Sequence, residues 1–248
     1  MHRKTGMLRG FTVPKSPFGQ AALTPPPPWH YAGDVVGVEF WTDADAAAAT
    51  LPNGLSPDPR SNGHAVMMFL DWQFTAQDDE YLEPAPYQYR EAFILVDAMY
   101  RDEPVMWCPY IYVDNDAALA RGWTQGYPKR FGRVFQTRYH AATGKAGPAL
   151  TAGSKFAASL TASGRRLAEA IVTLREPIKD PSVLTQKPVI NLLHFPRLAA
   201  NKQGQPVVHE LVENVPHDVK IEQAWIGDGS LKLPVADGEE ISDLAPLR

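Results

Sequence analysis

The sequence predicts an α+β fold that is mainly β, in which an antiparallel sheet closes into a barrel or cone with a few short helices. Three observations support this prediction. Nine segments are rich in β-branched, aromatic or alternating apolar residues, only two segments carry helix signals, and the two kinds do not alternate in the βαβ rhythm of a parallel sheet. A chain of 248 residues is long enough to bury a sizeable core.

The chain is expected to begin with an irregular arm, residues 1–30, followed by a single domain over residues 31–248. Four consecutive prolines at positions 25–28 favour an extended backbone at the end of the arm. Residues 31–40 (YAGDVVGVEF) are then predicted to form a strand. Thr42 and Asp43 are typical helix caps, so a short alanine-rich helix is expected over residues 44–51.

The centre of the chain predicts three strands and a second helix. The strands are residues 64–74, 87–100 and 105–113, with an acidic loop, 77–86, between the first two. The run Asp114, Asn115 and Asp116 supplies N-cap residues for a helix that continues to about Trp123 and ends at Gly126.

The second half predicts further strands separated by glycine-containing turns. The segments are residues 133–141, 155–162, 168–174, 207–212 and 219–226. In the last of these, apolar and charged residues alternate with the period of a half-exposed strand. The density of strands and the absence of an internal repeat favour one barrel or sandwich.

The composition excludes several classes of function. A net charge of -4 gives no basic surface for nucleic acid, and no window approaches the roughly 18 apolar residues of a membrane span. The single cysteine, Cys108, excludes a disulfide framework and a cysteine-based zinc site. The seven histidines show no metal-ligand spacing. We therefore expect a cytoplasmic protein with no metal, no nucleic-acid partner and no membrane.

One segment, residues 122–132 (GWTQGYPKRFG), combines features that favour a reactive lysine. Pro128 stiffens the backbone directly before Lys129, Phe131 supplies apolar surroundings, and Arg130 adds a second positive charge. Burial and a nearby cation both disfavour the ammonium form, so a free amine near neutral pH can attack a ketone. Taken alone, these residues also fit a solvated Lys-Arg pair in a surface loop.

At this segment the chain resembles the acetoacetate decarboxylase superfamily. Residues 127–132 (YPKRFG) are similar to its Tyr-Pro-Lys-Lys-Leu-Gly signature, whose first lysine forms a Schiff base and corresponds to Lys129. Acetoacetate decarboxylase is itself the standard example of a lysine activated by a neighbouring cation, so this mechanism comes from the resemblance. Arg130 stands where the second lysine lies, which keeps the charge.

The resemblance covers most of the chain and implies the same fold. Tyr89-Arg90-Glu91 is similar to the family's Tyr-x-Glu, which implies that Glu91 is a carboxylate of the catalytic site. Weaker matches follow in the family's order at residues 110–115, 188–196, 210–212, 224–227 and 231–233.

Departures from the family pattern bear on the activity. Decarboxylases of the family carry an arginine between an aromatic residue and Thr-Asp, and this arginine is thought to handle the substrate carboxylate. Trp41 occupies that place here, and it offers an indole donor in place of a bidentate guanidinium. Asp71 falls near a second family carboxylate, usually glutamate. Members that resemble aldolase-dehydratases use a tyrosine two residues before the glutamate and a glutamine four residues before the lysine, which Tyr89 and Gln125 match.

The resemblance thus implies a Schiff-base lyase that needs no cofactor. Lys129 condenses with pyruvate or a related 2-keto acid, the enamine attacks an aldehyde, and water is lost. Glu91 is expected to move protons as general acid and base. Four further residues are expected to orient or enclose the substrates: Tyr89, Gln125, Trp41 and Phe131. The expected partners are the keto acid, the aldehyde and further copies of the chain in a homo-oligomer.

Other interpretations remain open at this point. One is a decarboxylase of acetoacetate or another β-keto acid, with the carboxylate held by a different cation. Another is a non-catalytic barrel that binds a small ligand. Glu91 also fits a structural carboxylate paired with an arginine such as Arg130, and Tyr89 fits a core tyrosine. Gln125 fits a helix cap, and Trp41 fits plain packing.

Overall fold

The computed structural model describes residues 6–142, 144–184, 187–199, 201–202 and 204–247, so residues 1–5 of the expected arm lie outside the described residues. The helical elements are α1 (Ala44–Ala49), α2 (Pro84–Tyr87), α3 (Asp116–Thr124) and the 3-10 turns η1 (Glu80–Leu82), η2 (Pro181–Val183) and η3 (Ile241–Leu244). The strands are β1 (His30–Trp41), β2 (Ser56–Pro57), β3 (His64–Thr75), β4 (Gln88–Tyr100), β5 (Glu103–Val113), β6 (Lys129–Phe131), β7 (Arg133–Gln136), β8 (Lys155–Ala162), β9 (Arg165–Pro177), β10 (Val189–Phe195), β11 (Val208–Asn214) and β12 (Trp225–Lys232).

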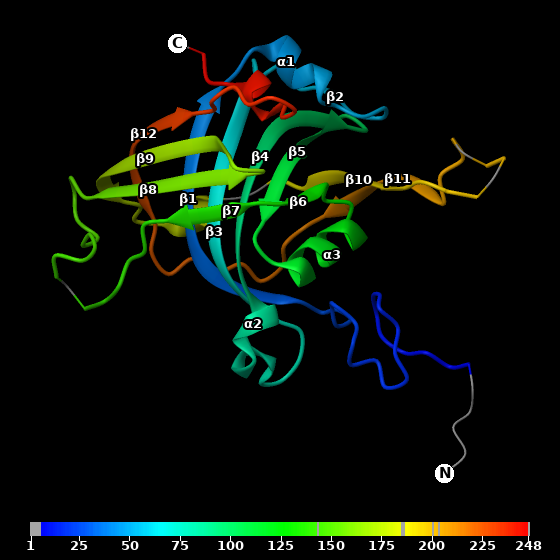
Figure 1. The fold of residues 1–248 in the computed structure, drawn as a ribbon. Helices are drawn as coiled ribbons and strands as arrows, with labels where there is room; N and C mark the ends of the chain where they lie inside the picture. The colour runs from blue at the N-terminus through cyan, green and yellow to red at the C-terminus, as the bar shows by residue number, and fades with distance from the viewer. Residues whose placement is uncertain (1–5, 143, 185–186, 200, 203, 248) are drawn as a thin grey trace.

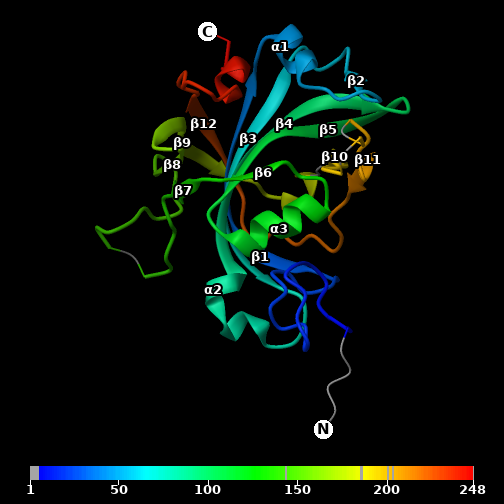
Figure 2. The ribbon, with the colours of Figure 1, turned by 45° about the vertical axis from the view of Figure 1, so that its right-hand side comes forward.

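The strands form two sheets, which Figures 1 and 2 show from two directions. The larger sheet has the order β1-β3-β4-β5-β10-β11, with β2 added to β4 and β6 added to β5. The smaller sheet has the order β12-β9-β8-β7. Most neighbours are antiparallel, and β5 pairs in parallel with both β6 and β10. A mainly β fold with few, short helices is therefore confirmed.

The predicted closure into a barrel is not confirmed. In the described part of the chain each hydrogen-bonded path begins and ends at a different strand, β1 and β11 in one sheet and β12 and β7 in the other. The main core lies between the two sheets. It contains Met67, Phe69 and Ile94 from the larger sheet and Leu160 and Leu167 from the second, all with 0% exposure. Helix α3 packs against β5 and β6 of the larger sheet.

The helix before the predicted lysine forms as the sequence indicates. The side chain of Asn115 accepts a hydrogen bond from the backbone N–H of Ala118 and caps α3. Gly126 follows the helix with φ of +80°, a left-handed conformation that glycine adopts without strain. The backbone N–H of Tyr127 then donates to the carbonyl of Gly122, which turns the chain back toward β5.

Two strand assignments need correction. Residues 219–224 lie outside any strand, and the last strand is β12, which begins at Trp225. Its partner β9 ends at Pro177, opposite Trp225, and among the described residues the pairing continues only through the hydrogen bond from the backbone N–H of Ile178 to the carbonyl of Ala224. The pattern analysis also did not assign β10, although residues 188–196 matched the family. None of the described helices is long and apolar enough to cross a membrane.

Candidate active site

Lys129 is the first residue of β6 and lies in register with Ile111 of β5. Its side chain is only 5% exposed, because it runs from β6 along the surface of α3. A Cβ atom at Gly122 of α3 would overlap the Cγ, Cδ and Cε atoms of Lys129. Glycine at this position therefore provides the channel that the lysine side chain occupies. The indole N–H of Trp123 donates to the carbonyl of Lys129 at 2.9 Å and fixes the strand beside the helix.

The amine of Lys129 meets a carboxylate in the interior. Its Nζ atom lies 2.5 Å from Oε2 of Glu91, whose side chain is 8% exposed and projects from β4. Glu91 therefore pairs with Lys129 and not with Arg130. A buried ion pair of this kind costs desolvation energy, so it is weak evidence for a contribution to stability.

A second cation, Arg121, lies in the same interior. Arg121 is 1% exposed, and none of its three guanidinium nitrogens has a hydrogen-bond partner among the described residues. The guanidinium carbon lies 3.7 Å from the ring centroid of Phe74, 5.2 Å from that of Tyr89 and 5.5 Å from that of Tyr31. Aromatic faces attract a cation but do not replace its hydrogen bonds. The site thus holds a buried guanidinium that has no carboxylate partner among the described residues, with the phenols of Tyr31 and Tyr89 as its polar neighbours.

The surroundings lower the pKa of Lys129. Burial is the largest cause, and the positive charge of Arg121 acts in the same direction, while Glu91 opposes both by favouring the ammonium form. Burial also raises the pKa of Tyr89 well above its ordinary value, so its hydroxyl stays protonated. The amine is therefore available as a nucleophile at lower pH than that of an exposed lysine.

Tyr89 is one of the predicted residues that the fold brings to the lysine. Its ring centroid lies 5.4 Å from Nζ of Lys129, and the residue is 4% exposed on the same face of β4 as Glu91. Gln125 is close to Lys129 in the sequence, but its hydrogen bonds to described residues are made by its backbone. It is the C-cap of α3, and its carbonyl accepts a hydrogen bond from Asn214 at 3.1 Å. Its side chain makes no hydrogen bond to another described residue.

The expected effect of Arg130 on the lysine needs correction. Arg130 follows Lys129 on β6, and adjacent strand residues point to opposite faces. Its guanidinium pairs with both carboxylate oxygens of the buried Glu239, at 2.5 and 2.8 Å. The cation that lowers the pKa of Lys129 is Arg121. Phe131 is 61% exposed and does not enclose the amine.

Asp71 and Trp41 also lie away from Lys129. Asp71 is opposite Arg90 in the β3–β4 ladder, one residue out of step with Glu91, so it faces the other side of the sheet and pairs with Arg138 at 2.7 Å. Glu91 pairs with Leu70 of β3, and Leu70 pairs with Val35 of β1. Trp41 lies six residues beyond Val35, about 20 Å along the strand. Trp41 is 50% exposed there.

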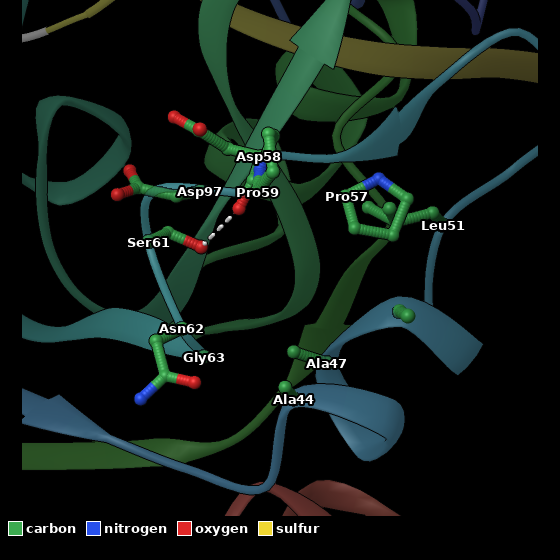
Figure 3. A pocket seen from close by; sticks show the side chains of 11 residues that line it. Ala44, Ala47, Leu51, Pro57, Asp58, Pro59, Ser61, Asn62, Gly63 and Asp97 are labelled. Atoms are coloured by element: carbon green, nitrogen blue, oxygen red, sulfur yellow. Dashed lines mark hydrogen bonds between the residues drawn. The ribbon is translucent and has the colours of Figure 1, made fainter.

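A separate pocket lies beside α1 and β2 (Figure 3), and its acidic groups already have partners. Asp97 accepts a hydrogen bond from Lys187 at 2.8 Å and pairs with His64 at 3.0 Å. Asp58 accepts from the backbone N–H of Arg60 at 2.9 Å. No group of three potential metal ligands occurs in the described part of the chain. The guanidinium nitrogens without partners belong to Arg121, and the amine with the lowered pKa belongs to Lys129. The candidate site is therefore placed around Lys129.

Sequence reasoning did not identify Arg121 as part of the site. A signal was present: on the helix predicted over residues 116–123, Ala117, Ala118, Arg121 and Gly122 share one face, and all four are buried. An arginine in a stripe of small residues with helical spacing is unusual, because buried arginines need a partner. The helical period therefore predicts that its guanidinium faces the interior.

Comparisons with known proteins give related enzymes over nearly the whole chain. A family model described as acetoacetate decarboxylase matches residues 12–248. The enduracididine biosynthesis enzyme MppR, complexed with the condensation product of pyruvate and imidazole 4-carboxaldehyde, is 36% identical with a TM-score of 0.88, over 98% of this chain and 90% of that chain. MppR complexed with pyruvate is 37% identical with a TM-score of 0.87, over 98% and 91%.

An acetoacetate decarboxylase-like enzyme from Sphingomonas wittichii RW1 is 24% identical with a TM-score of 0.85, over 96% of this chain and 93% of that chain, a likeness that shows the fold alone. No curated protein sequence matches the chain.

Proposed function

The chain belongs to the acetoacetate decarboxylase family, and we propose that it is a Schiff-base lyase that joins a 2-keto acid such as pyruvate to an aldehyde and then removes water. The observation that carries this proposal is the buried amine of Lys129, in contact with Glu91 and beside the unpaired guanidinium of Arg121. MppR, which is similar over almost the whole chain, is complexed with pyruvate and with the product of its condensation with an aldehyde.

Lys129 supplies the nucleophile. The neutral amine adds to the keto carbon, and loss of water from the carbinolamine leaves a protonated imine. The imine accepts the electron pair released when a proton leaves C3, which gives an enamine. The enamine carbon then attacks the aldehyde carbon, and the new alkoxide takes a proton. Loss of the second C3 proton and of the hydroxyl group as water gives a conjugated imine, and its hydrolysis frees Lys129 and the unsaturated keto acid.

Glu91 is the group placed to move these protons. Its carboxylate lies 2.5 Å from the lysine nitrogen, so it is within reach of the atoms that become the carbinolamine hydroxyl and C3. The same carboxyl returns its proton to the aldol hydroxyl when water leaves. Tyr89 remains a protonated donor next to it because burial raises its pKa.

Arg121 is the group placed to hold the substrate carboxylate. Its nitrogens are free, and a planar guanidinium binds a carboxylate with two parallel hydrogen bonds. A carboxylate held in this way is stabilised as an anion, which opposes its loss as carbon dioxide. This argument favours condensation, in which the carboxylate is retained, over decarboxylation of a β-keto acid.

The test is reductive trapping followed by turnover. The protein is incubated with pyruvate and sodium borohydride, and the modified peptide is located by mass spectrometry. We expect the adduct on Lys129, its loss in Lys129→Ala, and its retention in Lys155→Ala, a control on an exposed lysine of β8. Addition of an aldehyde should then give a product with conjugated ultraviolet absorbance. Trapping with acetoacetate and carbon dioxide release, without trapping by pyruvate, would overturn the proposal in favour of decarboxylation.

A further inference from the structure

A second polar group in the interior lacks partners. Asn191 of β10 has 0% exposure, and neither its amide nitrogen nor its amide oxygen has a hydrogen-bond partner among the described residues. Buried amides in native proteins are nearly always paired, so each exception needs a reason. A leucine of similar shape would fill the space without loss of hydrogen bonds. The polar side chain is therefore explained best by a ligand.

The direction of Asn191 follows from its strand. Asn191 and Val189 lie two residues apart on β10 and share a face. Val189 belongs to a small apolar cluster with Leu95 and Met106, against which the ring of Tyr127 packs. Burial raises the pKa of the Tyr127 hydroxyl, and the nearby amide of Asn191 acts in the opposite direction, although the contact between the two groups does not reach hydrogen-bond geometry. The amide of Asn191 thus lies beside the ring of Tyr127 on the same side of the sheet.

Tyr127 connects this amide to the reactive amine. Its ring centroid lies 5.9 Å from Nζ of Lys129. The turn before it is pressed against Asn191, because a Cβ at Gly126 would lie 3.1 Å from the Asn191 Cβ. The turn is also tied to β11 by the hydrogen bond from Asn214. The amide and the phenol are therefore fixed relative to the lysine.

The two groups without partners differ in chemistry. Arg121 is a cation and lies on the ring of Tyr89, where it suits the carboxylate of the keto acid. Asn191 is neutral, offers one donor side and one acceptor side, and adjoins apolar residues. A neutral donor or acceptor on an apolar body would satisfy Asn191 without bringing a further charge into the interior.

We propose that Asn191 and Tyr127 form the subsite for the aldehyde, and that they select an aldehyde carrying a neutral hydrogen-bonding group such as a ring nitrogen or a hydroxyl. This inference rests on the proposed function. It adds a specificity determinant: the amide rejects purely apolar aldehydes because they would leave its oxygen and nitrogen unpaired.

The test compares two aldehydes of similar size in the wild type and in Asn191→Leu. The probes are imidazole-4-carboxaldehyde and thiophene-2-carboxaldehyde, each with pyruvate, and the readout is the ratio of their kcat/KM values. We expect the wild type to prefer the imidazole by about tenfold or more, and the preference to disappear in the variant. Tyr127→Phe, which keeps the ring, should reduce the preference in the same direction. Equal effects on both aldehydes, or an unchanged ratio in both variants, would overturn the inference.

A binding measurement separates this inference from the proposed function. Ligand-observed NMR titrations use 4-methylpyrazole, which is neutral near neutral pH, and 2-methylthiophene; neither can react and neither needs a keto acid. We expect tighter binding of the pyrazole to the wild type and loss of that difference in Asn191→Leu. If the wild type shows no difference between the two probes, the subsite assignment is wrong, whatever the outcome of borohydride trapping. If the difference is present and trapping fails, only the proposed reaction is wrong.

Discussion

Replacing Arg121 by methionine should make the amine of Lys129 harder to deprotonate. The positive guanidinium disfavours a second positive charge nearby, and it is one of the causes that lower the pKa of Lys129. Methionine keeps a long, unbranched side chain among the aromatic rings and removes the charge. The variant should therefore need a higher pH to reach the same fraction of neutral amine.

The size of the effect follows from the geometry. The guanidinium carbon and Nζ of Lys129 lie 5.2 and 5.4 Å from the same Tyr89 ring centroid, so they are no more than about 11 Å apart. Two unit charges at about 11 Å in an effective dielectric constant of about 20 repel by about 1.5 kcal/mol. At a pH below the pKa, the fraction of neutral amine should therefore fall about tenfold in the variant.

The assay is borohydride trapping with a neutral ketone, followed as a function of pH. A neutral ketone isolates the charge effect, because it has no carboxylate for Arg121 to bind. The neutral amine predominates above the pKa, so the trapping curve of Arg121→Met should move to higher pH. Arg121→Lys keeps the charge and should leave this curve in place, while it weakens saturation by pyruvate because the bidentate fork is lost.

Arg130→Met is the matched control for charge. Arg130 is the sequence neighbour of Lys129, but its guanidinium is bound to Glu239 on the other side of β6. Its removal should leave the trapping curve unchanged. Coincident curves for wild type and Arg121→Met, or a shift in Arg130→Met and not in Arg121→Met, would refute the assignment of Arg121 as the perturbing cation.

Two further predictions concern the groups around the lysine. Gly122→Ala should lower the rate of Schiff-base trapping by about 10²-fold, because the new Cβ occupies the place of the Lys129 side chain. The gain in helix propensity of about 1 kcal/mol should only partly offset the disturbed ion pair of Lys129 and Glu91, so the Tm should fall, and trapping at the wild-type rate would contradict the role of the channel. Glu91→Gln should extend trapping to lower pH, because Glu91 raises the pKa of Lys129. The same variant should slow the exchange of the pyruvate C3 protons with deuterated solvent by about 10²-fold or more, as measured by NMR. Unchanged exchange would exclude Glu91 as the base.

Local patterns predicted most of the elements but not the way in which the sheets end. Strands rich in apolar, β-branched and aromatic residues, such as β1, β3 and β5, and the capped helix α3 depend on nearby residues that the sequence displays. Closure depends on which distant edges pair, and no local signal specifies that. The wrong strand at residues 219–226 has the same cause. Its alternation is real, but its partner β9 ends at Pro177, opposite Trp225.

The site was predictable where it depended on the motif and unpredictable where it depended on packing. Lys129 and Glu91 were named from the resemblance, and the fold places them in contact. The neighbouring cation was assigned to Arg130 because it is adjacent in sequence, but adjacency on a strand sends side chains apart. Arg121 precedes the lysine by eight residues and reaches it only because α3 folds back along β6.

The absence of an arginine at Trp41 does not leave the site without a cation, and this bears on the chemistry. Trp41 lies about 20 Å along the sheet from the level of Glu91, whereas Arg121 is within about 11 Å of the reactive amine and has every donor free. In the proposed reaction, a cation within this distance is available to the carboxylate of a keto acid that is bound to Lys129. It also holds that carboxylate as an anion while C3 reacts. We therefore propose that Arg121 binds the substrate carboxylate in place of the family's arginine, and the weakened saturation by pyruvate expected of Arg121→Lys tests this assignment.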